Sequence, residues 1–121
     1  MTAIRAYRDR SLSTAPPEKI VLMLFEALVR RLEQAAAKLE RSESAVEDLY
    51  VSREIFAELR SALDRNAAPE LATRLDRLYG WCMVELSGAG MARDAARVLD
   101  VHRLAVTLRD SWQKVVAVVA S

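Results

Sequence analysis

A run of apolar residues at helical spacing between Pro17 and Leu39 is the feature that most limits how this chain can fold. Apolar side chains recur there three and four positions apart, which is the pattern of a helix with one buried face. The members of this stripe are Ile20, Leu24, Leu28, Leu32, Ala35 and Leu39, widened by Val21, Phe25 and Val29. Because the stripe is wider than one neighbour can cover, we expect more than one helix of similar length to pack on it.

Capping signals predict the limits of two more helices. Ser44 followed by Glu47 has the spacing of a capping box, which predicts the start of the second helix. Pro69 predicts the start of the third helix, and Gly88 and Gly90 predict its end. The apolar face expected of the second helix comprises Leu49, Phe56, Leu59 and Leu63, with Val46 and Ile55 beside it. The face expected of the third helix comprises Leu71, Leu75, Leu78, Cys82 and Leu86.

A fourth helix is predicted from about Ala95 nearly to the C-terminus. The tail from Val115 to Ala120 is apolar on all sides, and we interpret it as the end of this helix, either frayed or bound to a partner. Four helices of similar length with short loops bury their apolar faces best as an antiparallel up-down bundle. The predicted fold is therefore all-α, with a four-helix bundle over residues 17–121 and a separate N-terminal arm over residues 1–16.

The arm has an apolar side formed by Ile4 and Tyr7, three positions apart in an otherwise polar segment. A short isolated segment cannot hold a helix by itself, so we expect these two side chains to lie against the bundle. The arm would then be either a fixed clasp or a removable cover, and the sequence does not decide between the two.

Charge and hydropathy exclude several classes of partner. The 18 Lys and Arg residues face 17 Asp and Glu residues, and they alternate at helical spacing instead of clustering, so no nucleic-acid partner is expected. No segment approaches the roughly 20 apolar residues of a membrane span, and the N-terminus lacks the apolar core of a secretory signal. The single cysteine, Cys82, cannot form an internal disulfide, which agrees with a reducing compartment. We therefore expect a cytoplasmic protein without membrane insertion.

The residues that enzymes and metal sites need do not converge in this sequence. His102 is the single histidine and has no glutamate three positions before it, which excludes a Glu-x-x-His di-iron bundle and a two-histidine zinc helix. Gly88-Ala89-Gly90 follows a helix and not a strand, so it does not predict a phosphate loop. We expect neither catalysis nor a metal nor a cofactor.

The third helix has more apolar residues than one core face requires. Tyr79, Trp81, Met83 and Val84 lie on faces next to the predicted stripe, so some of them must approach solvent. Because Tyr and Trp combine an apolar body with one polar tip, this surplus favours a partner groove. Tyr79 and Trp112 themselves are expected in the core before an interface.

Several short motifs follow one another along nearly the whole chain. They are Ile4-Arg5-Ala6-Tyr7, the run STAPPEKI from Ser13 to Ile20, Met23-Leu24-Phe25-Glu26, Leu75-x-x-Leu78-Tyr79-x-Trp81, and Trp112 near the end. Each motif is weak alone, but their order and spacing together resemble the flagellar export chaperone family, FliS.

The resemblance implies a cytoplasmic helical bundle that binds the disordered C-terminal segment of flagellin. Such a chaperone prevents premature polymerisation of flagellin and presents it to the flagellar type III export apparatus. A disordered amphipathic ligand can fold on a preformed apolar groove, so the physics agrees. Our hypothesis assigns partner binding to Ile4, Tyr7, Leu24, Phe25, Leu75, Leu78 and Trp81. In the free protein Ile4 and Tyr7 would cover part of the groove; alternatively, they simply complete the core.

Two other functions remain open at this stage. A helical secretion or regulatory adaptor with a different protein client would share the bundle but ignore flagellin. A catalytic bundle would need an added cofactor. The surplus apolar surface also leaves open a homodimer when no client is bound.

Overall fold

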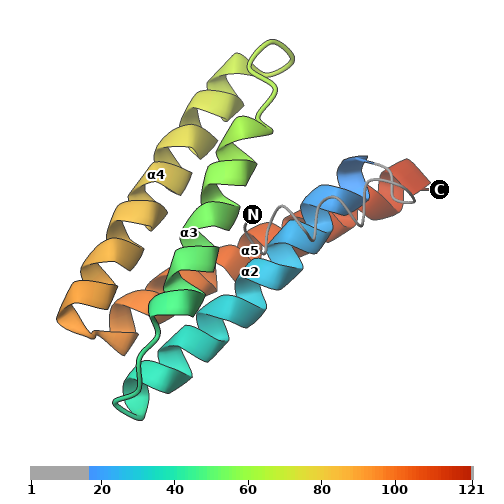
Figure 1. The fold of residues 1–121 in the computed structure, drawn as a ribbon. Helices are drawn as coiled ribbons and strands as arrows, with labels where there is room; N and C mark the ends of the chain where they lie inside the picture. Colours follow the sequence, from blue (N-terminus) through green and yellow to red (C-terminus); the bar gives the residue numbers. More distant parts are fainter. Residues whose placement is uncertain (1–16, 121) are drawn as a thin grey trace.

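The computed structural model describes residues 17–120, which form four α-helices (Figure 1). They are α2 (Pro17–Glu40), α3 (Val46–Ser61), α4 (Pro69–Ala92) and α5 (Ala95–Ala120). Successive helices run in opposite directions, and the described part of the chain contains no strand. The predicted all-α, up-down four-helix bundle is therefore confirmed. The predicted arm, with Ile4 and Tyr7, lies outside the described residues.

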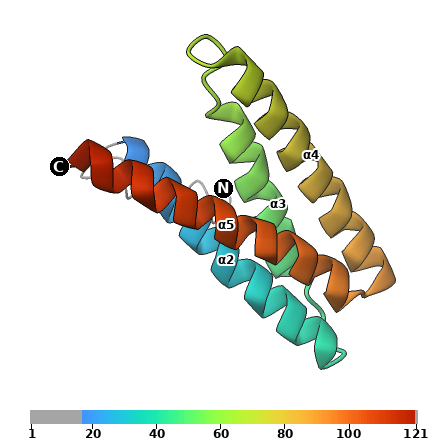
Figure 2. The ribbon, with the colours of Figure 1, turned by 180° about the vertical axis from the view of Figure 1, so that it is seen from behind.

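The helices are arranged as two pairs that cross each other. Helix α2 runs beside α5, and α3 runs beside α4, as Figures 1 and 2 show from opposite sides. The pairs meet at the end of the molecule where α2 joins α3 and α4 joins α5. They diverge toward the loop between α3 and α4, so the start of α2 and the end of α5 stand apart from that loop.

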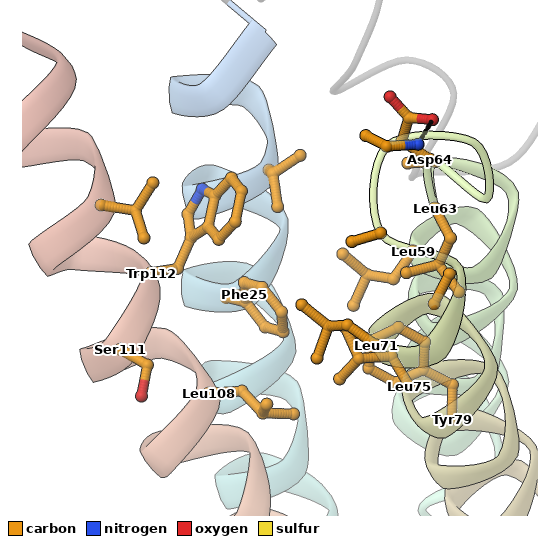
Figure 3. Close-up of a pocket in the computed structure, with 16 residues that line it drawn as sticks. Phe25, Leu59, Leu63, Asp64, Leu71, Leu75, Tyr79, Leu108, Ser111 and Trp112 are labelled. Carbon is orange, nitrogen blue, oxygen red and sulfur yellow. Dashed lines mark hydrogen bonds between the residues drawn. The ribbon is translucent and has the colours of Figure 1, made fainter.

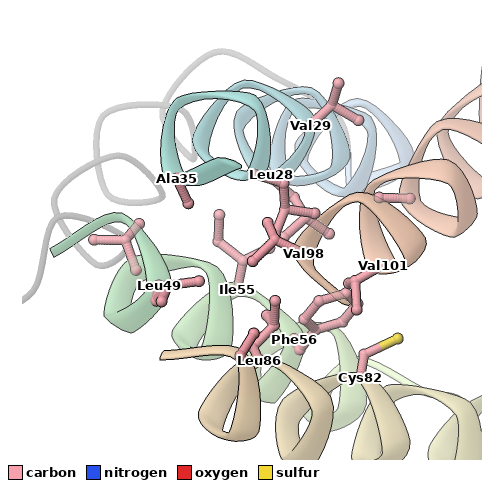
Figure 4. Close-up of a cluster of buried hydrophobic side chains, with 14 of the residues drawn as sticks. Leu28, Val29, Ala35, Leu49, Ile55, Phe56, Cys82, Leu86, Val98 and Val101 are labelled. Carbon is pink, nitrogen blue, oxygen red and sulfur yellow. The ribbon is translucent and has the colours of Figure 1, made fainter. Parts of the chain in front are cut away.

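The hydrophobic core lies where the two pairs cross. Figure 4 shows Leu28, Ile55, Leu86 and Val98, one from each helix, pointing toward one another. The largest apolar side chains that are almost fully removed from solvent are Leu28, Leu32, Ile55, Phe56, Cys82, Leu86, Val98 and Val101. The stripe predicted for α2 supplies most of its side of this core, as expected for a helix that contacts both α3 and α5.

The capping box predicted at the start of α3 is wrong. Ala45 occupies the N-cap position, and no side chain caps the helix. The Ser44 hydroxyl accepts a hydrogen bond from the N–H of Val46, only two residues on, at 3.4 Å. Ala45 and Asp48 are buried at this helix start, with Asp48 paired to Arg31 and Lys38 of α2, while Val46 is exposed. The Glu47 side chain points to solvent, 3.9 Å from Arg31.

The predicted end of α4 at Gly88 and Gly90 is also wrong, because the helix continues to Ala92. Both glycines sit at close approaches of other elements. A Cβ on Gly88 would clash with the Arg97 guanidinium, and a Cβ on Gly90 would lie 3.2 Å from Leu49 Cδ1. The helix ends at Arg93, which adopts the left-handed conformation with φ of 53°.

The buried face of α4 is rotated from the predicted stripe. Leu71, predicted to be buried, is 56% exposed. The residues that are buried on α4 are Ala72, Tyr79, Cys82, Leu86 and Ala89. The first turns of α4 lie at the end of the molecule where the helix pairs diverge, and there Ala72 is buried while Leu71 is exposed. The C-terminal tail of α5 is helical, as predicted, through Ala120.

An apolar cleft between the helix pairs

A cleft of about 450 Å3 opens where the two helix pairs diverge (Figure 3). All four helices and the loop between α3 and α4 contribute to its walls. Its large apolar lining residues are Val21, Phe25, Leu59, Leu63, Leu71, Leu75, Tyr79, Leu108, Trp112 and Val115. In Figure 3, Leu108 and Trp112 stand on one side, and Leu71 and Leu75 face them from the other.

The wall formed by α2 and α5 is joined by a hydrogen bond. The indole N–H of Trp112 on α5 donates to the carbonyl oxygen of Glu18 in the first turn of α2, with an N to O distance of 2.7 Å. The rest of the indole ring lines the cleft. The same side chain therefore closes one wall and presents apolar surface to whatever enters.

The opposite wall is held by polar contacts of the loop between α3 and α4 and of the two helices themselves. The Asp64 carboxylate accepts hydrogen bonds from the N–H groups of Asn66 and Ala67, each at 3.0 Å, and so fixes the loop between α3 and α4. Asp76 on α4 receives Arg60 of α3 at 3.0 Å and Arg65 of the loop at 3.1 Å. Hydrogen bonds from these two guanidinium groups lower the pKa of Asp76 below its ordinary value. The loop is thus tied to both helices that it connects.

The chemistry of the cleft suits apolar ligands. Among its described lining residues Asp64 alone is charged, and its carboxylate is already engaged by the loop. Burial raises the pKa of Tyr79 to about 12, so the phenol stays neutral at physiological pH. The walls therefore offer contact area for side chains such as Leu, Ile and Phe, and no acid–base pair.

The cleft brings together two of the predicted partner-binding residues, Phe25 and Leu75. Leu24 is 2% exposed and belongs to the core. Leu78 is half-buried and Trp81 is 49% exposed, and neither lines the cleft. Tyr79 is buried beside Phe56, with ring centroids 5.9 Å apart, in agreement with its predicted place in the core.

Sequence reasoning missed the contribution of α5 and of the α4 start to this cleft. Leu71 is predicted for the core, the sequence does not single out Leu108, and Val115 is expected only as the start of a helical tail that is frayed or bound to a partner; all three line the cleft. A signal was present, because the apolar pattern of α5 continues past the length that the core requires. The pattern does not reveal which side chains meet across the gap.

Other features of residues 17–120 bear on metal binding, catalysis and membrane insertion. These residues hold no group of three His, Cys, Asp or Glu side chains suited to a metal ion. The ring of His102 lies 3.1 Å from a Glu33 carboxylate oxygen, in a pair that joins α5 to α2. Burial raises the pKa of the Cys82 thiol to about 12, so it is protonated and unreactive at neutral pH. In the same range no helix has the length and apolar character to cross a membrane.

Comparison with known proteins agrees with the motif resemblance. The family described as "Flagellar protein FliS" matches residues 1–119. The flagellar secretion chaperone FliSB of Pseudomonas aeruginosa is 29% identical and aligns over 93% of this chain and 94% of its own. The flagellar secretion chaperone FliS of Vibrio cholerae is also 29% identical, over 93% and 88% of the two chains. That of Bacillus subtilis is 27% identical, over 92% and 84%.

All three relatives are named as flagellar secretion chaperones. The match covers the helices that build the cleft as well as the N-terminal motif. This chain therefore belongs to the flagellar protein FliS family.

Proposed function

We propose that this protein is a cytoplasmic export chaperone whose cleft binds the disordered C-terminal segment of flagellin. Bound in this way, flagellin would be kept from polymerising and could be delivered to the flagellar type III export apparatus. The proposal joins the family membership to the chemistry of the cleft.

The observation that carries the proposal is the open apolar cleft. A volume of about 450 Å3 falls within the range of roughly 300 to 1,000 Å3 of ligand sites. Leu71 exposes 56% of its surface at the rim, where a ligand could bury it. An amphipathic segment that folds as it binds can lay its apolar face into such a groove.

The N-terminal arm is our candidate for a cover of the same cleft. The first turn of α2 lies at the cleft, as the contact between Glu18 and Trp112 shows. Tyr7 lies ten residues before Pro17, a span of up to roughly 35 Å of extended chain, so Ile4 and Tyr7 could reach the apolar walls. We expect faster amide hydrogen exchange in the arm when client binds. Unchanged exchange would instead support the alternative in which these side chains complete the core.

Calorimetric titration with the C-terminal segment of flagellin from the same organism tests the main proposal. We expect saturable binding with a negative heat-capacity change, which reports burial of apolar surface. A segment with its apolar residues changed to serine should not bind. Failure of the natural segment to bind would contradict the proposal and favour an adaptor with a different client. Equal binding of both segments would contradict an apolar contact in the cleft.

Two exposed residues of α4 provide a matched pair of variants. Leu71→Ser removes an apolar side chain from the cleft and should weaken binding about tenfold, since burying half a leucine contributes about 1.4 kcal/mol. Val84→Ser changes a 70% exposed residue that does not line this cleft and should leave the affinity unchanged. Equal losses in the two variants would place the client elsewhere.

We also propose that the surplus apolar surface can support a homodimer in the absence of client. Sedimentation of the free protein tests this, with added flagellin segment as the competitor. A monomer at all concentrations would contradict it.

A further inference from the structure

Trp112 links two helices that form one wall of the cleft. Its indole N–H donates to the carbonyl oxygen of Glu18, 94 residues earlier in the chain, at 2.7 Å. Its ring lines the cleft together with Val21 and Phe25 of α2. Figure 3 shows the side chain reaching from α5 toward the first turns of α2. One residue therefore combines a polar link with an apolar contact surface.

The start of α2 needs such a link. The first turn of any helix has few internal hydrogen bonds and tends to fray. Within an α-helix the carbonyl of Glu18 accepts from the N–H of Leu22, and its second lone pair remains available to the indole. The wall residue Val21 lies less than one turn from Glu18, so movement of this turn would move the wall.

We propose that Trp112 is a positioning residue for client binding. Its hydrogen bond to Glu18 holds the α2 wall in the arrangement that the client meets, in addition to the apolar area of the ring. This inference rests on the proposed function, because it assigns the bound ligand to the same cleft. Its physical basis is preorganisation, since a wall that is already ordered costs less to order on binding.

The variant Trp112→Phe removes the donor and retains an aromatic ring. We expect it to bind the flagellin C-terminal segment roughly three- to tenfold more weakly in calorimetric titration, the range that one net hydrogen bond supports. Val115→Ala is the matched control, because it trims apolar area from the same α5 wall and removes no donor. It should weaken binding without loosening α2.

Amide hydrogen exchange separates positioning from general stabilisation and needs no client. In Trp112→Phe we expect faster exchange over residues 20–25, in the first two turns of α2. Exchange at Ile55 and Phe56 in the core should stay unchanged, whereas a purely structural role would accelerate both regions together. Val115→Ala should leave both regions unchanged.

The two indole N–H groups of the chain give a direct readout of the bond. In the unaltered protein the Trp112 indole N–H should exchange more slowly than that of Trp81, which is 49% exposed and serves as internal reference. Wild-type affinity of Trp112→Phe, or unchanged exchange over residues 20–25, would overturn the inference. Failure of the unaltered protein to bind the segment would contradict the proposed function alone, because the exchange comparison still decides whether the bond positions the wall.

Discussion

Asp48 in the first turn of α3 accepts a hydrogen bond of 2.8 Å from the Arg31 guanidinium on α2. The Asp48 side chain is only 1% exposed. The Lys38 ammonium lies 2.7 Å from its other oxygen, in an ion pair that lacks the alignment of a hydrogen bond. Arg31 and Lys38 of α2 thus compensate the charge of the buried Asp48 carboxylate. These two contacts hold the start of α3 against α2.

Asp48→Asn should lower the free energy of unfolding by about 2 kcal/mol. The substitution keeps the size of the side chain but removes the charge that Arg31 and Lys38 both pair with, and leaves Arg31 only the exposed Glu47 carboxylate at 3.9 Å. The cost falls below that of a fully buried pair because both cations still reach water. Urea unfolding measures the loss, with Asp100→Asn as control. Asp100 pairs with Arg103 at the surface, so its change should stay within about 0.5 kcal/mol. Similar losses in both variants would contradict a special role for the buried carboxylate.

The glycines of α4 differ in what a methyl group would meet. A Cβ on Gly80 would lie 3.6 Å from the Arg60 guanidinium, which is ordinary contact, so Gly80→Ala should raise the free energy of unfolding by about 0.5 to 1 kcal/mol. Gly88→Ala would displace Arg97 from its 2.8 Å pair with Glu85, so its gain should be smaller or absent. Thermal unfolding of the two variants tests this order, and a larger gain at Gly88 would contradict it.

The sequence predicted a helix correctly where a long, regular apolar pattern was sufficient to determine it. Residues 17–39 form the expected helix because their stripe, from Ile20 to Leu39, is long and regular. The glycine stop failed because glycine permits a helix end without requiring one. Here the two glycines lie inside the helix and permit close approach, Gly90 to Leu49 and Gly88 to Arg97. Such contacts join residues far apart in sequence and leave no periodic signal.

The cleft was predictable only in part for the same reason. Phe25 and Leu75 carry apolar patterns that mark them as buried or bound, and both line the cleft. Whether a leucine of such a stripe lies in the core, as Leu24 does, or at an open rim, as Leu71 does, depends on where the helix pairs cross. The position of that crossing depends on contacts among all four helices, which the apolar pattern of one helix does not reveal.

Arg93→Gly should stabilise the protein by about 1 kcal/mol. Arg93 ends α4 in the left-handed conformation, with φ of 53° and ψ of 45°, which is unfavourable for residues that carry a Cβ. Its N–H still donates to the carbonyl of Ala89, and glycine would keep this bond. Arg93→Ala is the control in urea unfolding, since alanine loses the charge but keeps the strain. An equal gain with alanine would attribute the effect to charge instead of backbone conformation.

The free energy of unfolding should fall in alkaline solution because the Cys82 thiol and the Tyr79 phenol are buried. Burial raises the pKa of Cys82 from 9.0 to about 12 and that of Tyr79 from 10.0 to about 12. Well below pH 9 both groups are protonated in the folded and the unfolded chain, so their favourable effect is complete. From about pH 9 to about pH 12 the unfolded chain releases protons that the folded chain retains, and the free energy of unfolding must therefore decrease as the pH rises.

Cys82→Ala isolates the thiol from the phenol. It should lower stability at every pH, because it leaves a small cavity in the core, but it removes the first of the two ionisations. The decline in the free energy of unfolding between pH 9 and pH 10 should therefore be shallower in Cys82→Ala than in the unaltered protein, while the decline above pH 10 from Tyr79 remains. Urea unfolding at several pH values gives both slopes. Parallel curves over pH 9 to 10 would show that the thiol ionises equally in the folded and unfolded chains. They would contradict the shielding of Cys82 from water that its burial at the crossing of the helix pairs predicts.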